Sequence, residues 1–214
     1  MSELTEELNK AHFRVAIFGS ARITEDDPVY KLVFNLARLI AGAGMDVVTG
    51  GGPGLMDAAS KGHFKGRKDS TLHSIGLNIK LPHEQSEAAH LDIKKDFKHF
   101  SDRLDHFIVL SNAFVITPGG VGTLLELLYT WQLTQVRQIS SKPIILLGEM
   151  WSGLIEWVKS WPLKNKLLDP EDLALLYITR NCDEAFTVIQ HAYEDYRKGG
   201  KEFCRIYHQY KIIP

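Results

Sequence analysis

The sequence predicts a single α/β domain built on a Rossmann-like, doubly wound parallel sheet flanked by helices. Short apolar segments rich in β-branched residues alternate with amphipathic segments of helical period along most of the 214 residues. The short segments are apolar almost throughout, which is typical of strands that are buried on both faces. Three of them end in glycine turns, GS at 19–20, GGGPG at 50–54 and PGGVG at 118–122.

The apolar runs predict the strands, which are 13–20, 45–50, 74–81, 113–117, 142–148 and 174–180. The first helix has the clearest pattern, because Pro28 opens it, apolar residues recur at helical spacing, and Gly42 and Gly44 close it. The predicted helices, the second of them starting as a glycine turn, are 28–44, 51–64, 98–112, 122–136, 151–162 and 183–199. Residues 82–97 are polar and are predicted to form a loop.

The predicted domain covers residues 13–198, preceded by an N-terminal extension at 1–12 and followed by a C-terminal arm at 199–214. The formal net charge is -1, so the whole chain offers no electrostatic argument for binding nucleic acid or an anionic membrane. No apolar run approaches the ~18 residues of a membrane span. The polar start of the chain does not resemble a signal peptide.

Cysteine and histidine usage points to a cytoplasmic protein without a metal site. Cys182 and Cys204 lie far apart in the sequence, which suits a reducing compartment and argues against a disulfide scaffold. The nine histidines show no HExxH or comparable ligand spacing. We therefore expect neither a metal nor an organic cofactor.

The glycine turns suggest an anion-binding site. Right-handed crossovers place the carboxyl ends of parallel strands at one edge of the sheet, where ligands bind. A helix N-terminus at that edge offers free N–H groups to phosphate oxygens, and glycines leave room for them. The residues predicted to contact the ligand in this way are Gly19, Ser20, Gly51, Gly52, Gly119, Gly120, Gly122 and Thr123. The alternative is that the glycines serve only close strand–helix packing.

The form of the turns favours a monophosphate. The first turn, FGSARI, is not a GxGxxG motif, and no lysine follows the glycines as it would in a Walker loop. These two features argue against a dinucleotide and against ATP.

Glu126 has two interpretations. Thr123 and Glu126 have the spacing of a capping box, in which the glutamate bonds back to the start of the helix. Alternatively, Glu126 is a catalytic carboxylate that the helix N-terminus keeps ionised, and it would then serve as a general base or stabilise a positive charge. An ionised carboxylate near a bound phosphate would face the cation that develops when a glycosidic bond breaks.

The segments PGGVGTLLE and GGGPGLMDAASKG resemble the paired motifs of the Lonely Guy family, also called possible lysine decarboxylases, and FGSAR and GLNIKLPHEQ resemble further family segments. The resemblance runs from about residue 13 to 190. It implies a Rossmann-like homodimer or larger homo-oligomer that splits a nucleoside 5′-monophosphate into free base and ribose 5-phosphate, without a cofactor.

The resemblance also assigns roles to residues. Glu126 falls on the family's catalytic glutamate and Arg103 on its catalytic arginine. The alternative for Arg103 is a solvated arginine on a helix surface that Asp102 or Asp105 neutralises. Glu84 lies in the loop after the third strand and is expected to contact the nucleotide, with loop capping as the alternative. Two positions depart from the family, because Leu104 replaces a lysine and Leu125 an acid.

We therefore expect hydrolysis of a purine nucleoside 5′-monophosphate, AMP or an N6-modified AMP of the cytokinin ribotide type. One alternative is a non-catalytic protein that binds a nucleotide or the molybdenum cofactor on the same fold. A second is a regulatory dimer in which the glycines serve packing alone. Trp131 and the Leu-rich face of its helix are expected to form part of a dimer contact.

Overall fold

The computed structural model describes residues 12–80 and 88–199. Their strands form one seven-stranded sheet in the order β4-β3-β2-β1-β5-β6-β7. All of its pairings are parallel. The strands are β1 (Arg14–Phe18), β2 (Asp46–Thr49), β3 (Ser74–Ile79), β4 (Ile93–Phe97), β5 (Ala113–Ile116), β6 (Ile144–Leu147) and β7 (Leu176–Thr179). This is the doubly wound parallel sheet that the alternation of apolar runs and amphipathic segments predicts.

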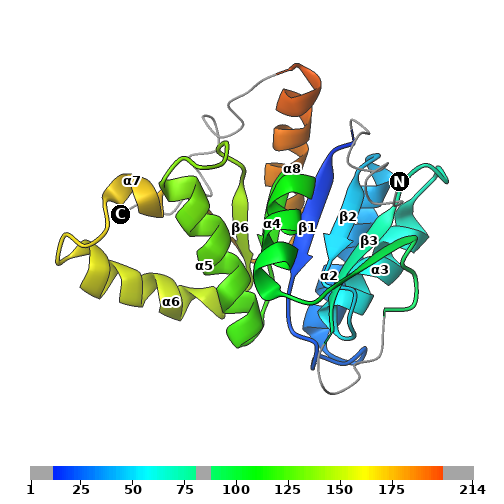
Figure 1. Cartoon of the computed structure of the whole chain (residues 1–214), viewed down its shortest axis with the longest axis horizontal. Helices are drawn as coiled ribbons and strands as arrows, with labels where there is room; N and C mark the ends of the chain where they lie inside the picture. Colours follow the sequence, from blue (N-terminus) through cyan, green and yellow to red (C-terminus); the bar gives the residue numbers. More distant parts are fainter. Residues whose placement is uncertain (1–11, 81–87, 200–214) are drawn as a thin grey trace.

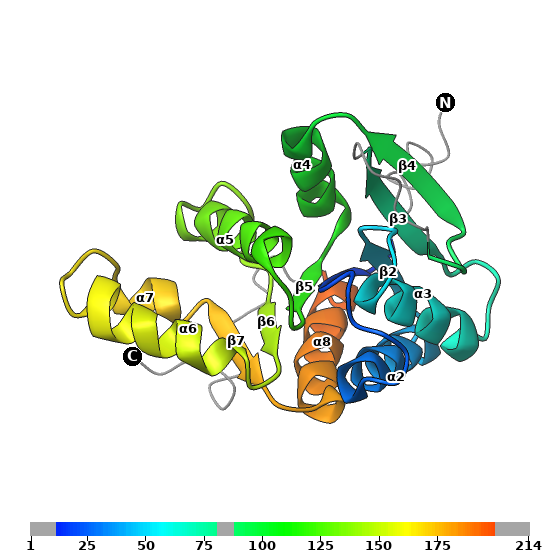
Figure 2. The same ribbon diagram turned by 90° about the horizontal axis from the view of Figure 1, so that it is seen from below.

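Helices cover both faces of the sheet, and each layer has its own apolar core (Figures 1 and 2). One face carries α2 (Pro28–Gly42), α3 (Leu55–Gly66) and α8 (Cys182–Arg197), and the other carries α4 (Phe100–Leu110), α5 (Val121–Gln135) and α6 (Trp151–Val158). Successive strand residues alternate between the two cores, so that Val15 and Ile17 face one layer while Ala16 and Phe18 face the other. The strands therefore need to be apolar almost throughout.

The chain reverses its direction of winding beside β1. It first proceeds outward through β2, β3 and β4, and then returns to place β5, β6 and β7 on the other side of β1. Ligands of open α/β sheets bind at this switch point, outside the carboxyl ends of the strands. Here those ends lead into the turns at Gly19, Gly50 and Pro118.

The predicted loop at 82–97 is partly wrong. Residues Ile93–Phe97 form the edge strand β4, which pairs with β3 from Ile75↔Ile93 to Ile79↔Phe97. Only Ile93 and Phe97 of this strand are buried, and Lys94, Lys95 and Asp96 lie between them. A strand at a sheet edge is commonly protected by charged residues of this kind, which removes the apolar signal.

One smaller element was not predicted either, and the predicted helix 151–162 is α-helical only as far as Val158. A short helix, α7 (Pro170–Leu173), starts at a capping box formed by Asp169 and Asp172. The segment after α6 continues as one turn of π-helix, η1 (Lys159–Leu163), which contains Pro162. Of the extension and arm expected at the chain ends, only His12 and Gly199 fall inside the described ranges. In those ranges no helix is both long and apolar enough to cross a membrane.

Candidate functional site

A cavity of about 510 Å³ opens at the carboxyl edge of the sheet, at the switch point beside β1. Its lining comes from the ends of β1 and β3, from the turns after β1 and β2, and from the helices α3, α4 and α5. The residues are Ile17, Phe18, Gly19, Ser20, Ala21, Arg22, Gly50, Met56, Ile79, Arg103, Gly120, Val121, Gly122, Thr123 and Glu126. The volume lies within the ~300–1,000 Å³ that small-molecule sites occupy.

A buried ion pair forms the charged part of the cavity. Arg103 on α4 and Glu126 on α5 are each only 8% exposed, and Nη1 of Arg103 lies 3.3 Å from Oε1 of Glu126. Arg103 also donates from Nε to the backbone carbonyl of Leu77 at 2.7 Å, and its guanidinium lies over the Phe107 ring. The arginine is therefore not neutralised on the surface by Asp102 or Asp105. Asp105 instead accepts a hydrogen bond from Tyr129.

Gly50 leaves the space that Arg103 occupies. A Cβ at this position would overlap the guanidinium of Arg103 and would also crowd the sulfur of Met56. The glycine turn after β2 thus serves the arginine at least as directly as it could serve a ligand.

The environment of Glu126 gives it a pKa near neutrality. Burial raises the pKa of Glu126 from its ordinary 4.5 to about 7, and the charge and hydrogen bond of Arg103 pull in the opposite direction. The prediction that the helix N-terminus keeps Glu126 firmly ionised is therefore wrong. Glu126 lies in the second turn of α5, where desolvation outweighs the helix dipole.

The capping-box prediction for Thr123 and Glu126 is also wrong. The N-cap of α5 is Gly120, which has no side-chain cap, and the helix begins at Val121. Thr123 is thus the third residue of the helix rather than its cap. The carboxylate of Glu126 accepts its hydrogen bond from Arg103.

The start of α5 presents open backbone to the cavity. The first helical hydrogen bond runs from Leu124 N to Gly120 O, so the preceding N–H groups have no partner within the helix. Apart from its neighbours in the chain and the backbone of the helix, a Cβ added at Gly120 or Gly122 would meet no described atom within 4 Å. Gly120 has a φ of -98°, a value open to any residue. These two glycines are therefore not required by packing or by backbone conformation, and they leave space at a helix N-terminus.

The other glycines predicted as ligand contacts divide into two groups. Gly19 and Ser20 line the cavity together with Gly120, Gly122 and Thr123, although a Cβ at Gly19 would also overlap Thr117. Gly51, Gly52 and Gly119 are not among the lining residues. Gly51 has a φ of +73° and its absent Cβ makes room for Asn78, so its role is structural. A Cβ at Gly119 would overlap Thr123. Glu84 lies outside the described residues.

Several lining residues were not predicted. Met56 and Ile79 are apolar side chains that reach the cavity from α3 and β3, and Arg22 is an exposed cation at its rim. Apolar residues of this kind carry no sequence signal, because they look the same as core residues. The sequence shows Gly50 as the first glycine of GGGPG, but its role, leaving space for Arg103, becomes clear only from the structure. Glu126 is the one carboxylate among the lining residues, and no histidine or cysteine is among them.

Comparison with known proteins shows which family the chain belongs to. The family model described as "Possible lysine decarboxylase" matches residues 56–189, more than half of the chain. The chain belongs to this family. It is the Lonely Guy family, and the glycine segments that resemble its motifs follow β2 and β5 here.

Solved structures share the fold of this family member. The molybdenum cofactor binding protein from the phototrophic bacterium Rippkaea orientalis superposes with a TM-score of 0.63 at 21% identity, over 84% of this chain and 96% of that chain. The molybdenum cofactor carrier protein from Chlamydomonas reinhardtii gives a TM-score of 0.58 at 19% identity, also over 84% of this chain and 96% of that chain. No curated protein sequence matches the chain.

The two departures from the family pattern lie away from the cavity wall. Leu104 on α4 is buried, and Leu125 on α5 is 42% exposed. Neither residue is among those that line the cavity. Both substitutions therefore leave the Arg103–Glu126 pair in place.

Proposed function

We propose that this protein hydrolyses the N-glycosidic bond of a purine nucleoside 5′-monophosphate, AMP or an N6-modified AMP, to give the free base and ribose 5-phosphate. The observation that carries the proposal is the buried Arg103–Glu126 pair beside the open N-terminus of α5. A phosphate would bind the free N–H groups at Gly120, Gly122 and Thr123, while the pair faces the sugar.

The cavity has hydrogen-bond donors on one part of its wall and apolar side chains on another, as a nucleotide requires. The open backbone of α5 and the hydroxyls of Ser20 and Thr123 offer donors to a phosphate. Met56 and Ile79 offer an apolar surface on which a purine could lie. Arg103, whose guanidinium stays protonated at any physiological pH, would bind ribose hydroxyls or the phosphate.

The proposed reaction transfers the ribosyl group to water. The C1′–N9 bond breaks with its electron pair going to the base, which takes up a proton, and a water oxygen forms the new bond to C1′. Ionised Glu126 stabilises the oxocarbenium-like transition state and accepts a proton from that water. A pKa near 7 allows Glu126 to hold and then release this proton at neutral pH. The proposal requires neither a metal nor an organic cofactor.

The experiment that tests the proposal is base release from nucleoside monophosphates, followed by chromatography. We expect adenine from AMP, little or none from adenosine, and inhibition by ribose 5-phosphate as a product. Equal turnover of adenosine and AMP would contradict a phosphate site at α5.

A second candidate is a non-catalytic carrier on the same fold, and the names of the two similar structures favour it. Both are molybdenum cofactor proteins. The base-release assay separates the two candidates, because a carrier would bind its ligand without producing free base. A packing-only role for the glycines would leave the melting temperature unchanged by any nucleotide.

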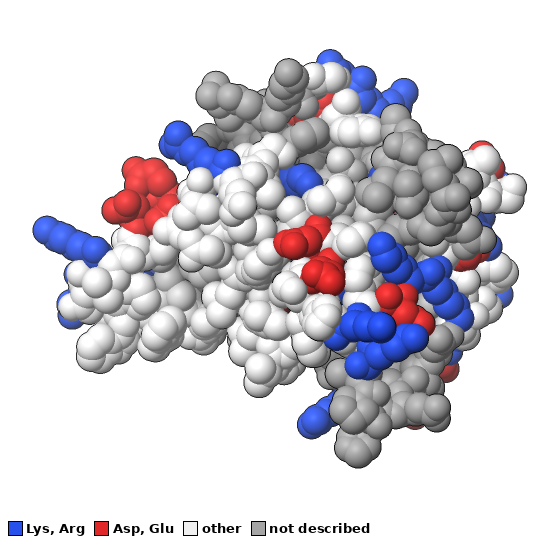
Figure 3. Space-filling model, viewed as in Figure 1, with Lys and Arg blue, Asp and Glu red and all other residues white. Residues whose placement is uncertain are grey.

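We further propose that the protein acts in the cytoplasm as a homodimer or larger homo-oligomer, without nucleic acid or membrane partners. The outer face of α5 supports an assembly, because Val121, Leu125 and Leu128 recur on it at helical spacing and are 84%, 42% and 50% exposed. The surface over α5 and α6 is largely uncharged in the view of Figure 3. Trp131 does not belong to that face, since it is buried and donates a hydrogen bond to the carbonyl of Asp172. The prediction of a contact through Trp131 is therefore wrong.

A further inference from the structure

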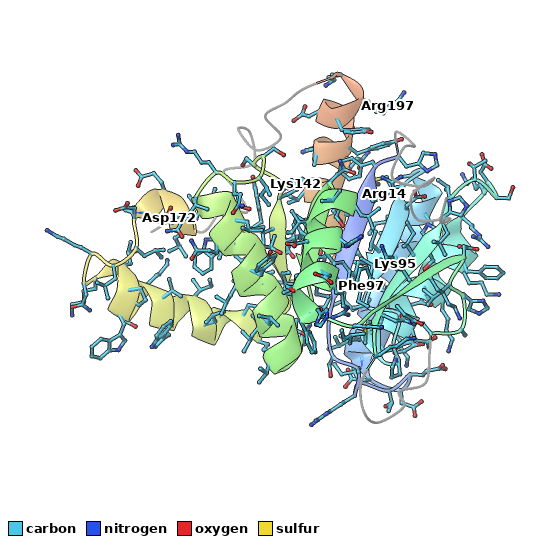
Figure 4. All side chains as sticks on the ribbon, in the orientation of Figure 1. Arg14, Lys95, Phe97, Lys142, Asp172 and Arg197 are labelled. Carbon is cyan, nitrogen blue, oxygen red and sulfur yellow. The ribbon has the colours of Figure 1, made fainter. Side chains whose placement is uncertain are left out.

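A second cluster of chemically capable side chains lies at the opposite edge of the sheet. Asp46 is the first residue of β2, His73 directly precedes β3, and His12 lies two residues before β1. These strands are neighbours in register, with Arg14 opposite Asp46 and Val47 opposite Ser74. The register brings together residues that are 34 and 27 positions apart in sequence. Figure 4 labels Arg14 at this end of the molecule, the same end as Arg197 of α8.

The three side chains form a compact set of potential metal ligands. Nδ1 of His12 lies 2.9 Å from Oδ2 of Asp46, and one ligand atom from each of the three residues lies within 4.8 Å of the others. Across residues 12–80 and 88–199, no other group of three His, Cys, Asp or Glu side chains meets this condition.

The backbone holds these residues firmly. The amide of Asp46 donates to the carbonyl of Phe13, the amide of Val47 donates to the carbonyl of His73, and the amide of His73 donates to Oδ1 of Asp46. The carboxylate of Asp46 is fully buried, whereas the side chain of His12 is 29% exposed. An ion could therefore approach from the side of His12 and meet a carboxylate whose position is already fixed.

We propose that His12, Asp46 and His73 bind a divalent transition metal of the zinc class. Two imidazoles and one carboxylate are the ligand set of zinc and its neighbours, whereas magnesium and calcium prefer oxygen ligands alone. Ligand atoms on a tetrahedral zinc ion lie about 3.3 Å apart, given its ligand bond lengths. The three ligand atoms, which lie within 4.8 Å of one another, would have to move closer together around the ion, and water would complete the coordination.

One nearby cation competes with such an ion. Nε of Arg14 lies 3.7 Å from the same Asp46 oxygen that accepts from His12. The alternative is that the three side chains and Arg14 form only a network of hydrogen bonds and ion pairs that links the starts of three strands. The two accounts differ in whether added metal binds at these residues.

The test uses the full-length protein, freed of metal by a chelator and titrated with Zn²⁺ by calorimetry and with Co²⁺ by visible absorption. We expect binding of one ion per chain, a Co²⁺ spectrum with the intensity of four- or five-coordinate sites, and a rise in melting temperature with Zn²⁺ but not with Mg²⁺. His12→Gln and His73→Gln should each weaken Zn²⁺ binding by more than about 10-fold, since even outer-sphere changes at metal sites reach that size.

The matched control is His99→Gln, because His99 is exposed at the start of α4, away from the cluster. Glutamine at position 12 can still donate a hydrogen bond to Asp46, so the network of hydrogen bonds is kept in that variant while an imidazole ligand is lost. Absence of Zn²⁺ binding in the parent protein would overturn the proposal. Binding that is unchanged in both cluster variants, or that is lost equally in His99→Gln, would assign the metal to other histidines and would also overturn it.

Discussion

Two carboxylates on the helices that follow β2 and β5, Asp57 and Glu126, each pair with a cation, yet their pKa values shift in opposite directions. Asp57 on α3 lies 2.8 Å from Nζ of Lys61, and it accepts further hydrogen bonds from the hydroxyl of Tyr30 and the amide of Ala89. Burial pushes the pKa of Asp57 upward, but Lys61 and these donors outweigh it, and the pKa falls below its ordinary 3.8.

Within the described part of the chain, the carboxylate of Glu126 pairs with Arg103 alone, and its position is more enclosed than that of Asp57. Its hydrogen bond to Arg103 is long, at 3.3 Å, and desolvation dominates, so the pKa rises to about 7. The comparison shows that an ion pair alone does not fix the protonation state of a carboxylate. The number of donors and the degree of burial decide it, and only Glu126 is poised to exchange a proton near neutral pH.

The largest expected effect is the difference in activity between Glu126→Gln and Asp57→Asn, each of which removes one carboxylate charge. Glu126→Gln should lower base release from AMP by ~10²-fold or more, the scale of a positioned acid–base group. AMP should bind at least as tightly, because Arg103 is released from its ion pair and a negative charge near the phosphate is lost. Measured by the same assay, Asp57→Asn should retain activity within about 2-fold. Full activity in Glu126→Gln would remove this residue from the mechanism.

A smaller effect is expected from filling the space at the start of α5. Gly120→Val should weaken AMP binding by at least about 10-fold, since a branched side chain would occupy the position proposed for the phosphate. The fold should persist, because φ at this position suits any residue and the new Cβ would meet no described atom within 4 Å other than those of its chain neighbours. Isothermal titration calorimetry measures the affinity and circular dichroism the fold. Unchanged affinity would show that the glycine does not serve the ligand.

The pH dependence of kcat/KM distinguishes the two carboxylates in the intact protein. Because the pKa of Glu126 is raised to about 7 and its ionised form is the active one, kcat/KM should be constant above that value. Below it, kcat/KM should fall by about tenfold per pH unit as the carboxylate takes up its proton. The substrate phosphate adds a second step near pH ~6. A profile without a step near 7 would assign the essential proton to another group.

The smallest expected effect concerns stability. Asp57→Asn removes the ion pair with Lys61 and should lower the free energy of unfolding by about 1 kcal/mol or less. The folded-state pKa of Asp57 is depressed, so its contribution is present above the ordinary value of 3.8 and disappears as the pH falls through the folded-state value. Urea unfolding at pH 7 and at pH 3 tests this, and parent and variant should converge at the lower pH. A difference that grows toward low pH would contradict the assignment.

The regular part of the fold was predictable because its signals are local. The strand Ala113–Ile116 and the helix Val121–Gln135 follow from apolar runs, a glycine turn and helical spacing. β4 was missed because an edge strand with three charged or polar central residues reads as a loop. The capping box was wrong because α5 begins two residues before Thr123, a shift that decides which side chain can cap it.

The site was predictable where contiguous residues build it and not where packing does. The motif at 118–126 pointed to Glu126, Gly120 and Gly122, the resemblance pointed to Arg103, and all four residues line the cavity. The raised pKa of Glu126 depends on burial between α4 and α5, which no local pattern records. Gly51 looked like a ligand contact, but its positive φ and the contact with Asn78 show a structural role. The cluster of His12, Asp46 and His73 depends on strand register and leaves no motif.

Direct titration of the two carboxylates tests most closely the claim that burial makes Glu126 the proton-exchanging residue. Carbon-13 NMR of the side-chain carboxyls, with Glu126→Gln and Asp57→Asn used to assign the resonances, gives both pKa values in the parent protein. We predict that the pKa of Glu126 is about 7 and that the pKa of Asp57 lies below 3.8. A Glu126 resonance that titrates near 4.5, the ordinary value for glutamate, would contradict the account.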